Sequence, residues 1–190
     1  MKRIILLIPL LLYAATVFSQ MGNGVWDIYD FGAKGDGTTL DTKALQTAID
    51  QCYEAGGGKV YLHNGYFVSG TIILKSNVTL YIEAGAVLKG SDNLDDFPIM
   101  PSKYPSYTGT LVTNKMLIYA EEAKNISICG RGVIDGNGDH FAGGPYASPS
   151  FSVRPRIIHF RACDNIHIKD ITLYNSASWV LLLKNQAVFE

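Results

Sequence analysis

The stretch NVTLYIEAGAVL at residues 77–88 decides the fold, because its pattern occurs three times in the chain. An asparagine, alternating apolar residues and a turn follow one another here, and again in NISICGRGVIDG at residues 125–136 and NIHIKDITLYN at residues 165–175. Such self-similarity is typical of a solenoid, in which successive coils stack on one another. We therefore predict an all-β fold, a right-handed parallel β-helix. The alternative is three unrelated hairpins in a β-sandwich.

The spacing of the repeat predicts the length of a coil. The three starting asparagines are 48 and 40 residues apart, which we interpret as two coils of about 20–25 residues in each interval. An asparagine at the same turn of each coil is expected to hydrogen-bond its neighbours and form a ladder.

Short strands and two long loops account for most of the remaining chain. Strands are predicted over residues 59–62, 66–74, 78–82 and 87–89, which are rich in Val, Ile, Leu and Tyr and are separated by turn residues. Two proline-containing segments then break the rhythm, residues 91–115 and 136–155. We predict that they are loops leaving the stack, and loops of this length are often functional.

Only one segment has helical character. Residues 41–55 read DTKALQTAIDQCYEA, and their apolar members recur at i, i+3, i+4 and i+7. Asp41 is predicted to be the N-cap, and the three glycines at residues 56–58 end the helix. The residues of the predicted buried face are Ala44, Leu45, Ala48, Ile49 and Cys52.

The N-terminus is typical of a secretory signal peptide. Lys2 and Arg3 precede an apolar run at residues 4–17, and Val17 and Ser19 suit a cleavage site before Gln20. The run is shorter than the roughly 20 residues that a transmembrane helix needs. We expect a secreted or periplasmic protein with no membrane contact after cleavage. The expected organisation is a signal peptide at 1–19, a cap segment with its helix at 20–58, and β-helix coils at 59–190.

Charge and cysteine content exclude several classes of partner. With 16 basic and 17 acidic residues the net charge is −1, so nucleic acid is not an expected partner. Three cysteines without metal-ligand spacing are expected to be mostly buried free thiols, and no metal or cofactor is predicted.

The first residues after the signal resemble a known capping segment. IYDFGAKGDGTTLDTKALQTAID at residues 28–50, followed by GGGKVY at 56–61, is similar to the N-terminal cap of the pectate-lyase-like β-helix superfamily. A solenoid has an open end whose apolar rung must be covered, and an amphipathic helix can cover it.

Within that superfamily the chain resembles the polygalacturonases, family 28 of the glycoside hydrolases. The resemblance rests on residues 70–91, on GRGVIDGNG at 130–138, on RPR at 154–156 and on DNIHIKDITLYNSASW at 164–179. It implies a secreted enzyme that hydrolyses galacturonosyl linkages, with an acidic plant polysaccharide such as pectin or polygalacturonate as its partner.

The catalytic strings of that family are not found in this sequence. The family uses Asn-Thr-Asp, Asp-Asp, Gly-His-Gly and Arg-Ile-Lys, whereas the sole Asp-Asp here, Asp95-Asp96, lies in the first proline-containing loop. No catalytic residue is therefore assigned. We expect a β-helix truncated on its C-terminal side, inactive by itself, with an exposed apolar last rung near residues 171–183 that favours self-association.

Cationic and aromatic side chains are the candidates for binding an acidic polysaccharide. Arginine pairs well with carboxylates, and tryptophan can stack on a sugar face. The alternatives are a lyase or epimerase relative, and a non-catalytic polysaccharide-binding β-helix. The candidate substrate-binding residues are Arg131, His140, Arg154, Arg156 and Trp179.

Overall fold

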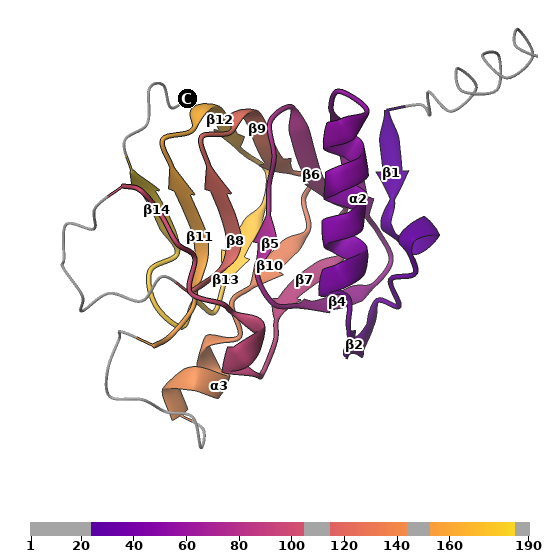
Figure 1. Ribbon diagram of the computed structural model, residues 1–190. Helices are drawn as coiled ribbons and strands as arrows, with labels where there is room; N and C mark the ends of the chain where they lie inside the picture. The colour runs from indigo at the N-terminus through magenta and orange to yellow at the C-terminus, as the bar shows by residue number, and fades with distance from the viewer. Residues whose placement is uncertain (1–23, 105–114, 144–152, 185–190) are drawn as a thin grey trace, which may run out of the picture.

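The computed structural model describes residues 24–104, 115–143 and 153–184. Within these ranges the strands form three sheets whose pairings are all parallel (Figure 1). The first sheet contains β1 (Val25–Asp27), β3 (Gly58–Leu62), β6 (Val78–Ile82), β9 (Lys124–Cys129) and β12 (Asp164–Ile168). The second contains β2 (Asp36–Leu40), β4 (Tyr66–Ser69), β7 (Val87–Gly90), β10 (Val133–Asp135) and β13 (Thr172–Tyr174). The third contains β5 (Ile72–Ile73), β8 (Met116–Glu121), β11 (Arg156–Arg161) and β14 (Leu181–Lys184).

The chain passes through the three sheets in the same order in successive coils. One coil is β3, β4 and β5, and the next is β6, β7 and β8. The same order repeats for β9, β10 and β11 and for β12, β13 and β14. The predicted all-β parallel β-helix is confirmed. The β-sandwich alternative is wrong, because hairpins would pair neighbouring strands antiparallel.

Apolar side chains stack in register inside the helix. Each sheet contributes a row in which one coil places its residue directly on that of the next, and every member is fully buried. Burying each such side chain contributes about 1.5–3 kcal/mol, so the stack of rows is the main source of stability. The three rows are Val60, Leu80 and Ile128; Phe67, Leu88 and Ile134; and Ile72, Ile118 and Ile158.

The predicted asparagine ladder is present at the turn into the first sheet. Asn125 Nδ2 donates to Asn77 Oδ1 at 2.9 Å, and Asn165 Nδ2 donates to Asn125 Oδ1 at 2.8 Å. All three asparagines have a left-handed backbone, with φ of 63°, 54° and 54°. Asparagine tolerates this conformation better than most residues do, so it serves both the turn and the ladder.

The ladder corrects the predicted coil length. Asn77, Asn125 and Asn165 are direct neighbours in space, so the intervals of 48 and 40 residues are one coil each and not two. The error arose because the long segments 91–115 and 136–155 belong to these coils as the connections from β7 to β8 and from β10 to β11. Residues 105–114 and 144–152 of the two segments lie outside the described residues.

The predicted helix is confirmed as α2 (Thr42–Glu54), with the expected residues Ala44, Leu45, Ala48, Ile49 and Cys52 buried. Its C-cap is Ala55, and the following Gly56 and Gly57 have φ values of 97° and 116°, which are accessible mainly to glycine. Figure 1 places α2 at the N-terminal end of the stack, opposite β14. It lies against β1, β3, β5 and the 3₁₀ helix η2 (Ile28–Phe31). Its role as a stabilising cap stays a prediction.

Asp41 precedes α2, but its side chain does not cap the helix. The carboxylate instead accepts the backbone N–H groups of Lys34 at 2.7 Å and Gly35 at 3.0 Å. Its backbone, with φ −93° and ψ 6°, is not the extended conformation in which an N-cap side chain reaches the first turn. The N-cap prediction was therefore right about the position and wrong about the hydrogen bond.

The predicted strand at residues 66–74 is two strands. It turns a corner at Gly70 and Thr71, which separate β4 in the second sheet from β5 in the third. A Cβ at Gly70 would lie 2.2 Å from the backbone oxygen of Asp96, so only glycine fits there. The sequence pattern did not reveal the bend, because residues 66–74 read as one run rich in aromatic and β-branched residues.

Cys52, Cys129 and Cys163 are free, as expected, although Cys129 is only partly buried. The signal peptide predicted at residues 1–19 lies outside the described residues. Among the described residues, no helix is both long and apolar enough to span a membrane.

Candidate functional site

The outer face of the second sheet carries a continuous row of mixed character. Leu40, Val68, Lys89, Asp135 and Tyr174 follow one another in register across β2, β4, β7, β10 and β13. The residues next to them along the same strands form the buried row of this sheet. Successive side chains of a strand point to opposite faces, so these five side chains point to the outer side. Leu40 and Tyr174 are 46% and 56% exposed. The face therefore offers apolar, charged and aromatic contacts along the axis of the helix.

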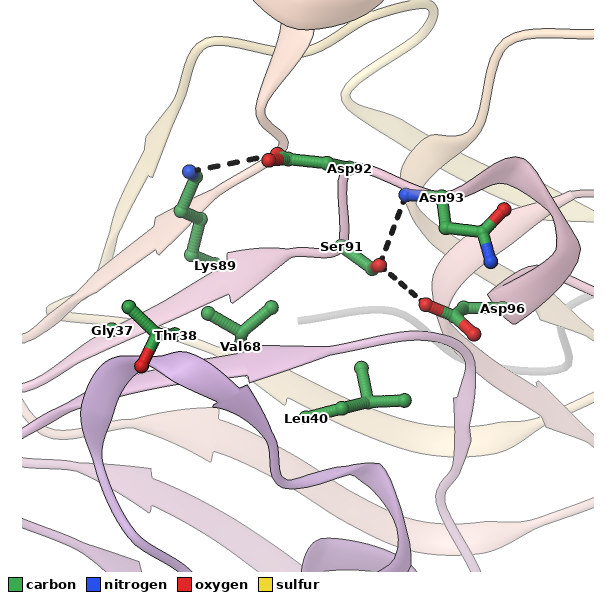
Figure 2. A pocket seen from close by; sticks show the side chains of 9 residues that line it. All are labelled: Gly37, Thr38, Leu40, Val68, Lys89, Ser91, Asp92, Asn93 and Asp96. Carbon is green, nitrogen blue, oxygen red and sulfur yellow. Dashed lines mark hydrogen bonds and ion pairs between the residues drawn. The ribbon is translucent and has the colours of Figure 1, made fainter.

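A pocket of about 330 Å³ opens on this face, over β2, β4 and β7 (Figure 2). Its floor is partly apolar, and one wall is the polar turn that follows β7. Carboxylate, amide and ammonium groups next to an apolar floor are suited to a ligand with hydroxyl groups and an apolar ring face. The lining residues are Gly37, Thr38, Leu40, Val68, Lys89, Ser91, Asp92, Asn93 and Asp96.

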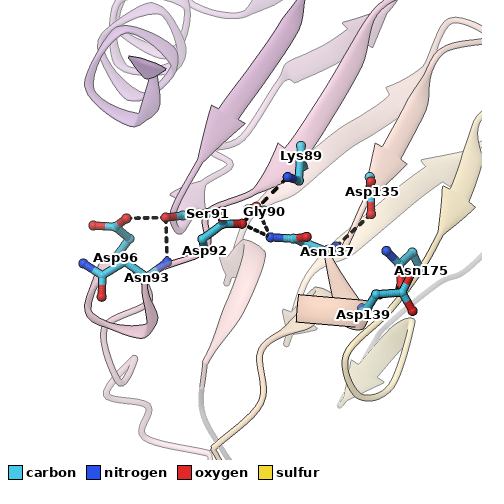
Figure 3. Close-up of polar contacts among 10 residues, drawn as sticks. All are labelled: Lys89, Gly90, Ser91, Asp92, Asn93, Asp96, Asp135, Asn137, Asp139 and Asn175. Atoms are coloured by element: carbon cyan, nitrogen blue, oxygen red, sulfur yellow. Dashed lines mark hydrogen bonds and ion pairs between the residues drawn. The ribbon is translucent and has the colours of Figure 1, made fainter. Parts of the chain in front are cut away.

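Polar side chains line the edge of the sheet where its strands end. We call Asp92, Asn137 and Asn175 the polar edge, because they follow β7, β10 and β13 (Figure 3). Asn137 Nδ2 donates to the Asp92 carboxylate and to Gly90 O, the latter at 3.1 Å. Asn175 Oδ1 accepts the N–H of Asp139 at 3.0 Å. The turns of three successive coils are thus joined by side-chain hydrogen bonds.

Glycine allows two of these turns to touch. A Cβ at Gly138 would lie 2.7 Å from the carbonyl carbon of Ser176, and one at Gly136 would lie 2.9 Å from the backbone oxygen of Asn175. Gly138 begins the short helix α3 (Gly138–Gly143) and donates its N–H to Asn175 O at 2.7 Å. The close approach holds α3 against the last described coil and positions the polar edge.

The turn after β7 is organised by its own acidic residues. Ser91 Oγ donates to the Asp96 carboxylate and accepts the N–H of Asn93 at 3.1 Å. Asp96 belongs to the 3₁₀ helix η3 (Leu94–Asp96). Lys89 Nζ lies 3.7 Å from Asp92 Oδ1, a loose ion pair on a surface where Asp92 is largely exposed. Because that pair is loose, the ammonium of Lys89 can exchange Asp92 for another anion.

The carboxylates of this region already accept hydrogen bonds from other groups of the chain. Asp92 accepts from Asn137, Asp96 accepts from Ser91, and Asp135 Oδ1 accepts the N–H of Asn137 at 2.8 Å. Among the described residues, no group of three or more His, Cys, Asp or Glu side chains could hold a metal ion.

Two of the predicted substrate-binding residues meet in space. Arg156 at the start of β11 lies with its guanidinium carbon 5.2 Å from the ring centre of Trp179, which follows β13. Arg156 is 2% exposed and Trp179 is 50% exposed. The pair therefore consists of a buried cation beneath an accessible indole.

The other predicted residues are spread around the same coils. His140 lies in α3 with its ring edge-on to Phe141 at 5.1 Å, and Arg154 is partly buried just before β11. Arg131 is exposed in the turn before β10, where its φ is 69°. Because the polar edge follows the other end of β10, Arg131 is not part of it. A substrate-binding role for these residues stays a prediction.

Buried cations change the ionisation of one histidine. Burial, with the positive charges of Arg161, Arg156 and Lys184, lowers the pKa of His159 to about 3. The ring is therefore neutral at physiological pH, and its Nε2 accepts from Arg161 Nε at 3.0 Å. Burial, with the charge of Arg161, lowers the pKa of Arg156 to about 10, so this guanidinium remains protonated.

Sequence reasoning missed the pocket and the polar edge. The sequence-based prediction assigned no site to four residues that each stand at or just after the end of a short apolar run. They are Lys89, Asp92, Asn137 and Asn175. That shared position was the available signal. It could not be used without knowing that residues 89, 137 and 175 lie in consecutive coils, which the error in coil length concealed.

Two curated proteins are similar to this chain over more than half of its length. The chain is 42% identical over 121 residues to exo-poly-α-D-galacturonosidase of Dickeya chrysanthemi, covering 60% of this chain and 20% of the relative. It is 32% identical over 164 residues to a Vitis vinifera protein named "Probable polygalacturonase", covering 80% of this chain and 32% of the relative. The chain thus spans about a third or less of these curated relatives.

A solved structure shows the same fold. The family 28 exopolygalacturonase of Yersinia enterocolitica superposes with a TM-score of 0.71 at 28% identity, over 85% of this chain and 37% of that one. The predicted resemblance to the polygalacturonases is confirmed. The family model described as "Rhamnogalacturonase A/epimerase, pectate lyase-like" matches residues 25–189. The chain belongs to the rhamnogalacturonase A/epimerase family of pectate-lyase-like proteins.

Proposed function

We propose that this chain forms the N-terminal coils of a secreted hydrolase of galacturonosyl linkages in pectin. The observation that carries the proposal is the similarity to proteins named for that activity, which extends over 60% and 80% of the chain. The pocket and the outer face of the second sheet support it, since they combine polar and apolar contacts along one direction.

A polygalacturonate chain would lie along this outer face. Lys89 is its best-placed cation, because it belongs to both the outward row and the pocket and is held only loosely by Asp92. A uronate carboxylate can take the place of Asp92 beside this ammonium. Asn93 and Asp92 are then within the same pocket for the sugar hydroxyls.

We expect this 190-residue chain to bind the polymer without hydrolysing it. Inverting glycoside hydrolysis needs an acid and a base separated by roughly 6.5–9.5 Å, both free to exchange protons with substrate and water. Asp92, Asp96 and Asp135 instead accept hydrogen bonds that hold their turns together. The site thus has the features of a surface that binds the polymer.

Calorimetric titration with polygalacturonate, together with a reducing-end assay, tests both parts of the proposal. Binding without new reducing ends is expected. Lys89→Met should weaken binding by about tenfold, the loss expected for one charged contact. Lys43→Met, an exposed position on α2, is the matched control and should not change it. Absence of binding by the wild-type chain contradicts the proposed substrate, and release of reducing ends contradicts the expected inactivity.

The same assay separates the alternatives. A lyase or epimerase relative, which the name of the family includes, would give unsaturated products or inverted sugar centres in place of reducing ends. A purely binding β-helix would give neither, even when joined to the remaining coils of a relative. Export remains part of the proposal, and sequencing the N-terminus of protein recovered from the growth medium tests cleavage after Ser19.

A further inference from the structure

A buried cation at the corner between the second and third sheets makes fewer hydrogen bonds than its guanidinium can donate. Arg156 is 2% exposed, and its Nε has no hydrogen-bond partner in the described part of the structure. Its Nη1 lies 3.4 Å from His159 Nδ1. Because His159 Nε2 accepts from Arg161, the proton of the neutral ring is on Nδ1, so this nitrogen cannot accept from Arg156.

Among the described residues, Arg156 also has no counter-charge at ion-pairing distance. A buried charge without a partner is costly, and each such group in a folded protein calls for an explanation. An anionic ligand close to this corner would offset that cost.

Trp179 marks where such a ligand would sit. Its indole covers the guanidinium at 5.2 Å, yet half of the residue remains exposed. A large aromatic side chain at a surface is expensive to leave in water, and an indole is a common platform for the apolar face of a sugar. The cation–π contact with the guanidinium favours this position of the ring.

We propose that Trp179 and Arg156 form a subsite for one uronate residue, in which the sugar ring stacks on the exposed indole and Arg156 supplies a buried positive field for its carboxylate. The inference rests on the proposed function, since it requires a uronate polymer. It places a second point of contact two coils from Lys89, at the corner where β13 leads to β14.

The field of Arg156 is effective because water does not screen it. Interactions of a charge in a protein interior fall off more slowly than those of a charge in solvent. Trp179 should therefore determine affinity for any stacked sugar, whereas Arg156 should determine the preference for a charged sugar over a neutral one. The two residues can be separated by experiment for this reason.

Tryptophan fluorescence provides a direct test. The chain contains two tryptophans, Trp26 and Trp179, so Trp26→Phe leaves Trp179 as the sole reporter. Adding trigalacturonate to this variant should change its emission saturably. Trp179→Ala should weaken binding of trigalacturonate and of its methyl ester alike, each by about tenfold. Trp26→Phe alone should leave the affinity unchanged.

Substitution of Arg156 tests the charge. Arg156→Met should lower the preference for the acid over the methyl ester by about tenfold, and Arg156→Lys should restore most of it. The Lys variant keeps the test valid if the Met variant does not fold. The ester comparison isolates the charge, because a general structural loss would weaken both ligands equally.

The possible failures are distinguishable. If the wild-type chain binds trigalacturonate while Trp179→Ala binds it equally well, the subsite is wrong and the proposed substrate stands. An unchanged acid-to-ester ratio in Arg156→Met overturns the role of Arg156. If the wild-type chain binds no galacturonate oligomer at all, the proposed function fails and the subsite fails with it.

Discussion

At the scale of single residues, His159 links the buried cations to the pH dependence of stability. Its pKa is about 3 in the folded protein, well below the ordinary value of 6.5. Between these values the unfolded chain binds more protons, so the free energy of unfolding falls as the pH falls. The loss is at most about 1.4 kcal/mol per pH unit for one group.

His159→Gln tests this dependence. Glutamine keeps an acceptor for Arg161 but does not titrate, so the variant should lose the contribution of His159 to the slope. Urea unfolding from about pH 7 to about pH 5 should show the wild type approaching the variant in stability as the pH is lowered. Parallel curves for the two proteins would mean that His159 is not held neutral by burial.

At the scale of the element, the turns into the first sheet depend on asparagine for two separate reasons. Asn125 bridges Asn77 and Asn165 through its side chain, and its backbone has a φ of 54°. A left-handed backbone costs roughly 1–2 kcal/mol for an ordinary L-residue and little for glycine. The side-chain ladder and the backbone conformation can therefore be measured independently.

Two substitutions at Asn125 separate these contributions. Asn125→Gly removes the side-chain ladder but adopts the left-handed backbone without strain. Asn125→Ala removes the ladder and also strains the backbone. We expect the stability order wild type, Asn125→Gly, Asn125→Ala, with about 1 kcal/mol between the two variants. Denaturant unfolding provides the measurement. Equal stability of the glycine and alanine variants would show that the turn relaxes out of its left-handed conformation.

At the scale of the whole molecule, a solenoid must satisfy the open edges of its sheets. Along the described chain, β5 is the first strand of the third sheet, so one of its sides has no neighbouring strand. Gln46 of α2 fills that place: its Nε2 donates to Ile73 O at 3.2 Å and its Oε1 accepts the N–H of Ile73 at 2.8 Å. The side chain thus makes the two hydrogen bonds that a neighbouring strand would offer Ile73, and we predict that it protects this edge.

Amide exchange tests this closing role. Gln46→Met keeps the length of the side chain and removes both hydrogen bonds to Ile73, so the amide of Ile73 should exchange faster with solvent. It also removes the bond that Nε2 donates to Asp50 Oδ1 at 2.8 Å, and the free energy of unfolding should fall by about 1–3 kcal/mol for the three lost bonds. Gln51→Met, exposed on the same helix, is the control. Unchanged exchange at Ile73 in Gln46→Met would show that α2 does not close this edge.

The sequence by itself determined what depends on nearby residues. The bounds of α2 and β6, the glycines after the helix and the asparagine of each turn follow from local spacing and backbone preference, and the repeat identified the solenoid. The coil length could not be derived, since loops of unequal length conceal which segments stack. The bend at Gly70 could not be derived because it lies inside a run that reads as one strand.

The tertiary structure decided which side chains meet. Asp41 holds Lys34 and Gly35, Asn137 reaches Asp92, and Trp179 covers Arg156. Local backbone preference does not predict the last two contacts, because each joins segments of different coils. They depend on the register in which one coil stacks on the next, and that register is set by burial of the whole apolar interior.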